Sequence, residues 1–313
     1  MALTVTDFFE EGRDPFELEV VCGETHLGRV IKEPAINRPG LALTGFFQYF
    51  ANLRIQVMGL AELTYLKHLP DDETRSARLA QLFEQRIPCV VLTRNRHAPP
   101  ELLAQAESYR VPVLKTPMIT NRFINRATLL MEDLSAPRRK FQGTMLDIKG
   151  MGVLIEGQPG IGKSETALAL IERGHSLISD DLTLLRRDNL GTVVGSADEV
   201  TRYHMEIRGL GIIHVPSLFG VASMRREMRL DLVIRLATFD EHADYDRTGM
   251  RSETVSLLGA DIPLLTIPVA PGRDIAHVVE VAALNQKLKQ LGHDAAKELD
   301  EKLMRALERK RRQ

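Results

Sequence analysis

The sequence predicts two α/β domains, the second of which carries a loop suited to binding phosphate groups. Three observations lead to this expectation. The chain has 313 residues, enough for two domains of roughly 150 residues each. Short apolar runs alternate with helical patterns in both halves, which is typical of sheets that contain parallel strands. A glycine-rich segment of the second half stands between a strand and a helix, as phosphate loops do.

The composition narrows the classes of protein that the chain can represent. Its 41 basic and 42 acidic residues give a formal net charge of -1, so no overall field attracts nucleic acid or anionic lipid. No stretch approaches the ~18 consecutive apolar residues of a membrane helix, and the acidic start lacks the features of a signal peptide. We therefore expect a cytoplasmic protein in which Cys22 and Cys89 are ordinary buried thiols.

Residues 1–134 are predicted to form the first, small α/β domain. Its apolar strands and amphipathic helices alternate, which favours a parallel sheet, and a helix over 122–134 is expected to lead into the second domain. This half of the sequence contains no nucleophile–base pair, metal-ligand cluster or glycine-rich phosphate loop, so we interpret it as a docking or regulatory domain. The expected elements are a strand at 54–59, a helix at 74–86, a strand at 87–95, a helix at 101–108 and a strand at 111–116.

Residues 135–313 are predicted to form the second domain, which begins with paired strands at 143–148 and 151–157. The second strand enters a segment that matches G-x-x-x-x-G-K-[ST] at every fixed position. Glycines let backbone N–H groups approach phosphate oxygens, and the positive end of the following helix adds to the attraction. Lys163 is expected to reach the β- and γ-phosphates, and the Ser164 hydroxyl to bind Mg²⁺. The candidate nucleotide-binding residues are Gly157, Gln158, Pro159, Gly160, Ile161, Gly162, Lys163 and Ser164.

Two adjacent acids, Asp180 and Asp181, end the strand that follows the loop helix. In a parallel sheet, that strand end lies at the edge where the loop binds phosphate. One carboxylate could hold Mg²⁺ through water, and the other could take a proton from an attacking hydroxyl, as in phosphoryl transfer to an alcohol. The alternative is a solvated strand end followed by a turn.

Three further charged residues are candidates for the same site. Glu206 and Arg208 lie in a glycine-containing stretch, where an acid would suit the metal and a cation would suit phosphate. Arg247 lies in a polar, turn-rich segment and could stabilise charge on a transferring phosphoryl group. Spacing alone leaves surface ion pairs open as the alternative for each. Four histidines show no helical or metal-site spacing and are expected to be structural or exposed: His175, His204, His214 and His242.

The chain is expected to end in two helices. A turn at Pro271 and Gly272 precedes the first helix, for which Asp274 is the candidate N-cap. The second helix carries a basic end that is expected to be solvated or frayed. The apolar positions of the first helix share one face and are Ile275, Val278, Val279 and Ala282.

Taken together, several segments resemble the bacterial HPr kinase/phosphorylase family. Four segments of the second half have that family's order and spacing: GQPGIGKSETALALIERGHSLISDD, MEIRGLGIIHV, DYDRTG and PVAPGR. In the first half, the family's N-terminal domain is similar to INRPGLALTGFFQYF followed by RIQVMG. The resemblance implies an enzyme that uses ATP to phosphorylate a serine of HPr, the phosphocarrier of the sugar phosphotransferase system. It also implies removal of that phosphate by inorganic phosphate, which yields pyrophosphate.

The resemblance further implies an assembly and a set of residue roles. The assembly would be a homohexamer, built through a P-loop kinase domain that resembles phosphoenolpyruvate carboxykinase. Residues 157–164 would bind ATP, with Lys163 on the β- and γ-phosphates. Ser164 and Glu206 would bind Mg²⁺. Asp181 would be the base for phosphorylation and the acid for the reverse reaction.

Other implied roles concern the transferring group and the balance between the two directions. Arg247 would stabilise the transferring group, 205–214 would serve both directions, and 268–273 would serve mainly the dephosphorylation. One position departs from the family pattern, because Gln142 stands where the family has a histidine. A glutamine cannot titrate near neutral pH as imidazole can. We therefore expect a lowered ratio of phosphorylase to kinase activity, unless hydrogen bonding at residue 142 is sufficient.

Two other functions remain open at the level of sequence. The first is a small-molecule kinase that uses the same loop, which the protein-sized N-terminal domain argues against. The second is a regulator that senses nucleotides without transferring phosphate. Asp181 and Arg247 distinguish these possibilities, because a pure sensor has no use for a base beside the γ-phosphate.

Overall fold

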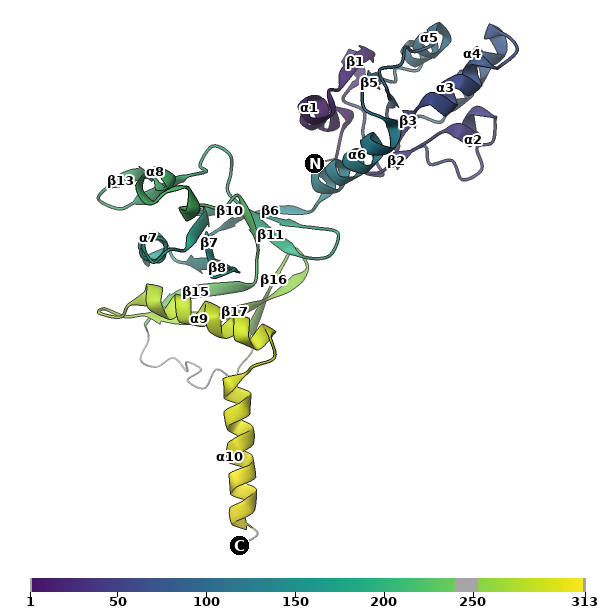
Figure 1. The fold of residues 1–313 in the computed structure, drawn as a ribbon. Helices are drawn as coiled ribbons and strands as arrows, with labels where there is room; N and C mark the ends of the chain where they lie inside the picture. Colours follow the sequence, from purple (N-terminus) through teal and green to yellow (C-terminus); the bar gives the residue numbers. More distant parts are fainter. Residues whose placement is uncertain (1, 240–252, 312–313) are drawn as a thin grey trace. The chain divides into compact units, whose positions relative to one another are not determined.

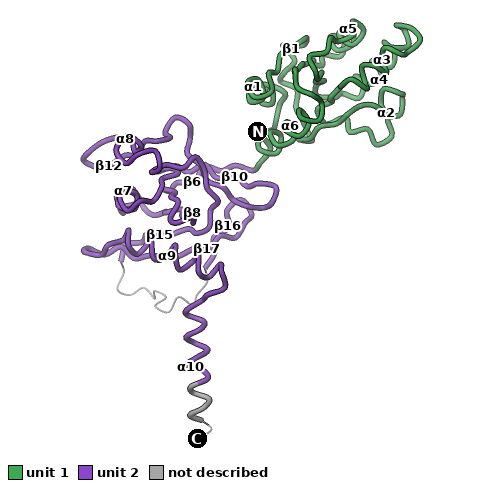
Figure 2. Tube along the Cα trace, viewed as in Figure 1, with its two compact units in different colours: residues 1–136 green, residues 137–313 purple. Residues whose placement is uncertain are grey.

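The computed structural model describes residues 2–239 and 253–311 (Figure 1). The chain divides into two compact units, residues 1–136 and residues 137–313 (Figure 2). Each unit is an α/β structure with its own sheet and core. The predicted fold class, two α/β domains, is therefore confirmed.

Unit 1 is built on a five-stranded sheet with the order β1-β5-β4-β3-β2. The last four of these strands are mutually parallel, as the alternation of strands and helices predicts, whereas β1 is an antiparallel edge strand. The strands are β1 (Glu19–Cys22), β2 (Ile36–Asn37), β3 (Ile55–Met58), β4 (Val90–Leu92) and β5 (Val113–Lys115). The helices are α1 (Val5–Phe16), α2 (Gly40–Leu43), α3 (Leu60–Lys67), α4 (Asp72–Glu84), α5 (Pro100–Ser108) and α6 (Thr120–Ser135), with a 3-10 turn at Glu24–His26.

Helices cover both faces of this sheet. Phe8 of α1 and Phe123 of α6 pack with Val91 on one face, and Leu82 of α4 packs with Val90 on the other. Adjacent residues of β4 thus enter opposite cores, which requires an apolar side chain at every position of the strand. That is why the strand reads as a continuous apolar run.

Unit 2 is built on three sheets. The largest has the order β16-β17-β15-β8-β7-β9, a second has β14-β11-β10-β6, and β12 and β13 form a hairpin. The strands are β6 (Arg138–Gln142), β7 (Thr144–Ile148), β8 (Met151–Gly157), β9 (Ser176–Ser179), β10 (Leu182–Arg187), β11 (Val193–Ser196), β12 (His204–Ile207), β13 (Gly211–His214), β14 (Glu227–Arg229), β15 (Leu232–Thr238), β16 (Glu253–Leu257) and β17 (Ala260–Val269). The helices are α7 (Lys163–Glu172), α8 (Val215–Phe219), α9 (Ile275–Gln290) and α10 (Ala295–Arg311), with a 3-10 turn at Val221–Ser223.

The large sheet is mixed, which corrects the expectation of a parallel sheet around the phosphate loop. β7 lies between β8 and β9 and is antiparallel to both. β8 and β9 therefore run in the same direction, two strands apart. Their carboxyl ends still meet at one edge, so the phosphate loop and the paired acids are brought to the same side of the sheet.

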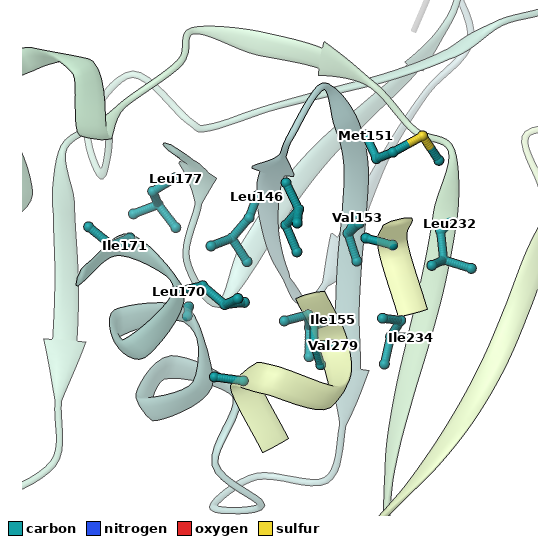
Figure 3. Close-up of a cluster of buried hydrophobic side chains, with 14 of the residues drawn as sticks. Leu146, Met151, Val153, Ile155, Leu170, Ile171, Leu177, Leu232, Ile234 and Val279 are labelled. Atoms are coloured by element: carbon teal, nitrogen blue, oxygen red, sulfur yellow. The ribbon is translucent and has the colours of Figure 1, made fainter. Parts of the chain in front are cut away.

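The core behind this edge holds the loop in place. Figure 3 shows Val153 and Ile155 of β8 in one cluster with Leu170 of α7 and Val279 of α9. The cluster is essentially closed to solvent, with Val153 and Leu170 both 0% exposed. Because the strand before the loop and the helix after it share this cluster, the loop between them is fixed at both ends.

Helix α9, the first of the two C-terminal helices, begins at its predicted N-cap. Asp274 caps α9, since its carboxylate accepts a hydrogen bond from the backbone N–H of His277 (3.0 Å), which confirms the predicted N-cap. The predicted apolar face of α9 packs against the core through Val279 and its neighbours Ile275, Val278 and Ala282. Within 2–239 and 253–311, no helix is long and apolar enough to cross a membrane.

Candidate functional site

The phosphate loop joins β8 to α7. Gly162, the N-cap of α7, has a φ of 104°, and a Cβ on Gly157 would come within 2.7 Å of the Leu236 carbonyl oxygen. The first position needs a residue without a Cβ for its backbone conformation, and the second needs one for space. Within the part of the chain that the structure describes, no side chain caps the start of α7, so the first turn of that helix can offer its N–H groups to an anion.

The Lys163 side chain is buried and hydrogen-bonded to the start of the loop. Its side chain is only 7% exposed, and its Nζ donates hydrogen bonds to the carbonyl oxygens of Gly157 (3.2 Å) and Gln158 (3.3 Å). An ammonium group held this way keeps the two ends of the loop together. Phosphate oxygens would compete with these carbonyls for the same ammonium, and a charged acceptor makes the stronger hydrogen bond.

Asp180 is hydrogen-bonded directly to the loop helix. The Ser164 hydroxyl donates to its Oδ1 (3.2 Å), the Thr144 hydroxyl donates to the same oxygen (2.8 Å), and the Glu206 N–H donates to Oδ2 (3.4 Å). Burial raises the pKa of Asp180 above its ordinary value, and the neighbouring charge of Asp181 adds to the rise, whereas the three hydrogen bonds oppose it. One carboxylate thus connects the loop helix, β7 and β12.

Asp181 has a different environment. It is exposed, and its φ of 56° places the backbone in the left-handed region. Its carbonyl oxygen accepts a hydrogen bond from the Gly143 N–H (2.9 Å), which holds the end of β6 beside it. The two adjacent acids therefore have different environments: Asp180 is hydrogen-bonded to Ser164, whereas Asp181 is open to a cavity.

That cavity has a volume of about 520 Å³ and adjoins the loop. It brings together most of the residues that the sequence proposed for the site. Arg208 lies over the loop, because a Cβ on Gly160 would be 3.2 Å from one of its guanidinium nitrogens. The lining consists of Lys140, Gln142, Pro159, Gly160, Gly162, Lys163, Ser164, Glu165, Asp181, Leu182, Glu206 and Arg208.

A second cavity of about 600 Å³ adjoins the other side of the loop and shares Gln142 and Pro159 with the first. Gly157, Gln158 and Ile161 also line it, and Ile161 packs against the core as well. Its charged residues, Glu156 and Arg235, form an ion pair of 2.6 Å. Two candidate residues, Gln142 and the loop residue Pro159, thus border both cavities, and sequence spacing could not indicate this placement of Gln142.

The structure describes one of two further predicted parts of the site. Arg247 lies outside the residues that the structure describes, as does His242. The segment 268–273 begins with the last two residues of β17 and continues into a turn, where Arg273 donates a hydrogen bond to the Pro268 carbonyl (3.3 Å). This bond folds the segment back on itself and leaves it exposed at Pro271–Arg273.

Three features depend on pairing between strands and were not predicted from the sequence. Thr144 is bonded to Asp180, Lys140 lines the cavity, and His204 lies opposite His214, with ring centroids 5.2 Å apart. Alternation along the strand at 138–142 could have suggested that Lys140 and Gln142 share a face. Nothing local indicates the other two contacts.

The oxygen donors of the site fit a magnesium ion. Ser164, Asp180 and Glu206 offer a hydroxyl and two carboxylates, which are ligand types that Mg²⁺ prefers. In the described part of the chain, no three acidic, histidine or cysteine side chains form a metal-binding group. In phosphoryl-transfer enzymes, Mg²⁺ is usually bound by one or two protein oxygens together with water and substrate phosphates.

A strand, a glycine-rich loop with a lysine and a helix beginning at a serine define a P-loop phosphate-binding protein. The exposed Asp181 carboxylate lines the same cavity as this loop. Comparison with known families gives the particular family. Residues 133–303 match the HPr serine kinase C-terminal domain, and residues 3–131 match the HPr serine kinase N terminus. The chain belongs to the HPr serine kinase family.

Two relatives that span almost the whole chain agree with this assignment, and one solved structure is also similar in sequence. An HPr kinase/phosphorylase of Bacillus licheniformis is 41% identical over 295 residues, which cover 94% of this chain and 95% of the relative. One of Caldicellulosiruptor bescii is 44% identical over 282 residues, 90% of each chain. The solved structure of the Hpr(Ser) kinase/phosphatase from Coxiella burnetii is 34% identical, with a TM-score of 0.47, and the match covers 51% of this chain and 98% of that one.

Proposed function

We propose that this protein is a cytoplasmic enzyme that phosphorylates a serine of the phosphocarrier HPr with ATP and removes that phosphate with inorganic phosphate. The observation that carries the proposal is that Asp181 opens into the same cavity as Lys163 and Ser164. A loop that only sensed a nucleotide would not need an exposed carboxylate there. Relatives named HPr kinase/phosphorylase that span almost the whole chain support the choice of substrate.

In the kinase direction, the loop and Lys163 hold the triphosphate while Asp181 accepts the proton of the serine hydroxyl. The serine oxygen forms a bond to the γ-phosphorus as the bond to the β–γ bridging oxygen breaks, and ADP leaves. In the reverse direction, an oxygen of inorganic phosphate attacks the phosphorus of phosphoserine. The bond to the serine oxygen breaks, Asp181 returns the proton to that oxygen, and pyrophosphate is released.

The proposed metal is Mg²⁺, with Ser164 and Glu206 as the residues that would hold it. When bound, it would neutralise part of the charge on the phosphates. Asp180 accepts the Ser164 hydrogen bond and so orients that hydroxyl. Its own carboxylate could reach the ion through a water molecule.

The remaining assignments follow the family resemblance. Arg247 would stabilise the transferring phosphoryl group, 205–214 would act in both directions, and 268–273 mainly in dephosphorylation. At residue 142, between the two cavities, this chain has an amide where the family has a titratable histidine. This difference would lower the ratio of phosphorylase to kinase activity. Equal ratios in the native protein and Gln142→His would contradict this last assignment.

A homohexamer is part of the proposal. Its support in this chain is an exposed apolar stripe on α9, where Val281, Leu284 and Leu288 are 49%, 38% and 48% exposed. Their spacing places them on one side of the helix, and such surfaces commonly meet another subunit. Light scattering after gel filtration measures the assembly, and a monomer at micromolar concentration would exclude it.

The decisive test is incubation of the purified protein with Mg-ATP and HPr, followed by incubation of phosphorylated HPr with inorganic phosphate. We expect phosphoserine in the first reaction and pyrophosphate in the second. ATP binding without phosphoserine would overturn the proposal and favour a nucleotide sensor. Transfer to a small molecule but not to HPr would favour a small-molecule kinase.

A further inference from the structure

The face of β6 toward the first cavity carries a residue with no role in the mechanism above. Side chains alternate along a strand, and β6 follows this rule: Lys140 and Gln142 both line the cavity, whereas Phe141 between them packs against a buried core cluster. Lys140 and Gln142, two positions apart on one strand, therefore both border the cavity.

Hydrogen bonding fixes this strand beside the paired acids. β6 pairs with β10 so that Gln142 lies opposite Leu182 and Lys140 lies opposite Leu184. Gly143, directly after β6, donates its N–H to the Asp181 carbonyl oxygen (2.9 Å). The base proposed for phosphoryl transfer and the lysine strand are thus held in register by backbone bonds, which side-chain substitutions leave intact.

The Lys140 ammonium is only loosely held. Its Nζ lies 3.8 Å from the Asp198 carboxylate, and its side chain is 66% exposed. An exposed pair at that distance contributes little, because water screens it and two long side chains must be ordered. A phosphate group entering the cavity can therefore attract this ammonium away from Asp198.

The balance of charge around the cavity indicates that a phosphate group bound there needs the positive charge of Lys140. The charged residues of its described lining are Lys140, Lys163 and Arg208 on the basic side, and Glu165, Asp181 and Glu206 on the acidic side. Of the three cations, Lys163 is hydrogen-bonded to loop carbonyls and Arg208 lies against Gly160. Without Lys140 the formal charge of the lining would be negative, which disfavours a multiply charged phosphate.

We propose that Lys140 is a phosphate-binding residue of this active site, and that it supplies the positive charge that the Gln142 amide lacks. The proposal rests on the proposed function and concerns mainly its reverse direction. Phosphorolysis brings together two anions, inorganic phosphate and phosphoserine, whereas the kinase reaction brings a neutral hydroxyl to ATP. A cation beside Asp181 therefore lowers the barrier of phosphorolysis more than that of phosphorylation.

The first experiment compares Lys140→Met, Lys140→Arg and the matched control Arg138→Met in both directions with HPr. Arg138 has the same strand parity but is outside the described lining of the cavity. For Lys140→Met we expect the KM for inorganic phosphate to rise about tenfold or more, with kinase kcat/KM changed by less than about threefold. Lys140→Arg should retain near-native values because it keeps the charge, and retained kinase activity reports that each variant is folded.

The second experiment restores a cation from the neighbouring position. In Lys140→Met/Gln142→His, imidazole can carry the charge, so phosphorolysis should recover as pH falls through about 6.5, and recovery should exceed the gain from Gln142→His alone. A merely structural role for Lys140 would create no such pH dependence. If Lys140→Met and Arg138→Met lost phosphorolysis equally, or if Lys140→Met lost none while the kinase reaction was active, the assignment of Lys140 would be overturned. The proposed function would still stand in either case. A native protein inactive with HPr would overturn the proposed function and this inference together.

Discussion

The two units each place a glycine between a parallel strand and a helix, but only unit 2 leaves the start of that helix open. Among the described residues of unit 2, no side chain caps α7, and apart from the chain neighbours of Gly162 no atom lies within 4 Å of a Cβ built on that glycine. In unit 1, the Gly59 N–H before α3 donates to the Glu62 carboxylate (2.8 Å). A Cβ on Gly59 would be 2.5 Å from the Thr120 hydroxyl.

Unit 1 thus supplies its helix start with an anion of its own. Glu62 is 4% exposed and accepts two hydrogen bonds from Arg38, of 2.9 and 3.1 Å. Unit 2 keeps an equivalent junction free and surrounds it with a cavity. The comparison teaches that a strand–glycine–helix junction binds an external phosphate only when its N–H groups lack an internal acceptor and space remains beside them.

The largest expected effect comes from the open junction of unit 2. Asp181→Asn should lower both directions of phosphoryl transfer by about 10²–10⁴-fold, because the amide cannot accept the serine proton. Nucleotide affinity should change little, since the loop itself is untouched. Turnover with HPr and nucleotide titration measure the two quantities, with the exposed Asp261→Asn as control. Near-native turnover of Asp181→Asn would contradict the role of this carboxylate.

The next effect concerns the closed junction of unit 1. Glu62→Ala should lower the free energy of unfolding of this unit by about 3 kcal/mol, because the cap is lost and the buried Gly59 N–H is left without its acceptor. Glu62→Gln keeps an acceptor oxygen and should lose less. Urea unfolding followed by circular dichroism measures both. Equal stability of Glu62→Ala and the native protein would show that the internal anion is not needed.

A matched pair of glycine substitutions separates the two reasons for glycine at these junctions. Gly59→Ala should cost about 2 kcal/mol, because its Cβ meets the Thr120 hydroxyl in a filled space. Gly162→Ala should cost about 1 kcal/mol through its positive φ alone, since its Cβ meets no atom. Thermal unfolding of the two variants measures the difference. The reverse order of stability would contradict this account.

The smallest expected effect is a pH dependence from Asp180. Because burial raises its folded-state pKa above the ordinary value, the folded protein retains a proton there that the unfolded chain has released. This contribution to stability is complete below the ordinary pKa and is lost as pH rises through the raised one. In unfolding titrations from about pH 4 to about pH 7, the stability of the native protein relative to Asp180→Asn should therefore fall. A constant difference would exclude the effect.

The thiols follow the same principle of burial. Cys89 is fully buried, and the loss of solvation raises its pKa to about 12, while burial also raises the pKa of the half-buried Cys22. Both were expected from sequence to be ordinary buried thiols; Cys89 is buried, whereas Cys22 is only partly buried. Their pKa values favour the unreactive protonated form at neutral pH.

The phosphate loop, the helix after it and the Asp274 cap could be predicted because each is a short-range pattern. Their residues are within one or two turns of one another, so spacing along the chain equals proximity in space. The three central strands of unit 1 could also be predicted, since strands buried on both faces are largely apolar, whereas the partly exposed strands β1 and β2 were not predicted. The mixed order of the unit 2 sheet could not be predicted, because pairing between distant strands leaves no local trace.

By itself, the sequence determined that a phosphate loop stands beside two acids and that the chain has the motifs of its family. Only the tertiary structure decided which acid bonds to Ser164, which one opens into the cavity, and that Lys140 joins it there. These outcomes depend on the register of β6, β7 and β10, and a shift by one residue would turn every side chain to the opposite face. Register is set by hydrogen bonds between segments some 40 residues apart in the chain, such as Gly143 with Asp181 and Thr144 with Asp180.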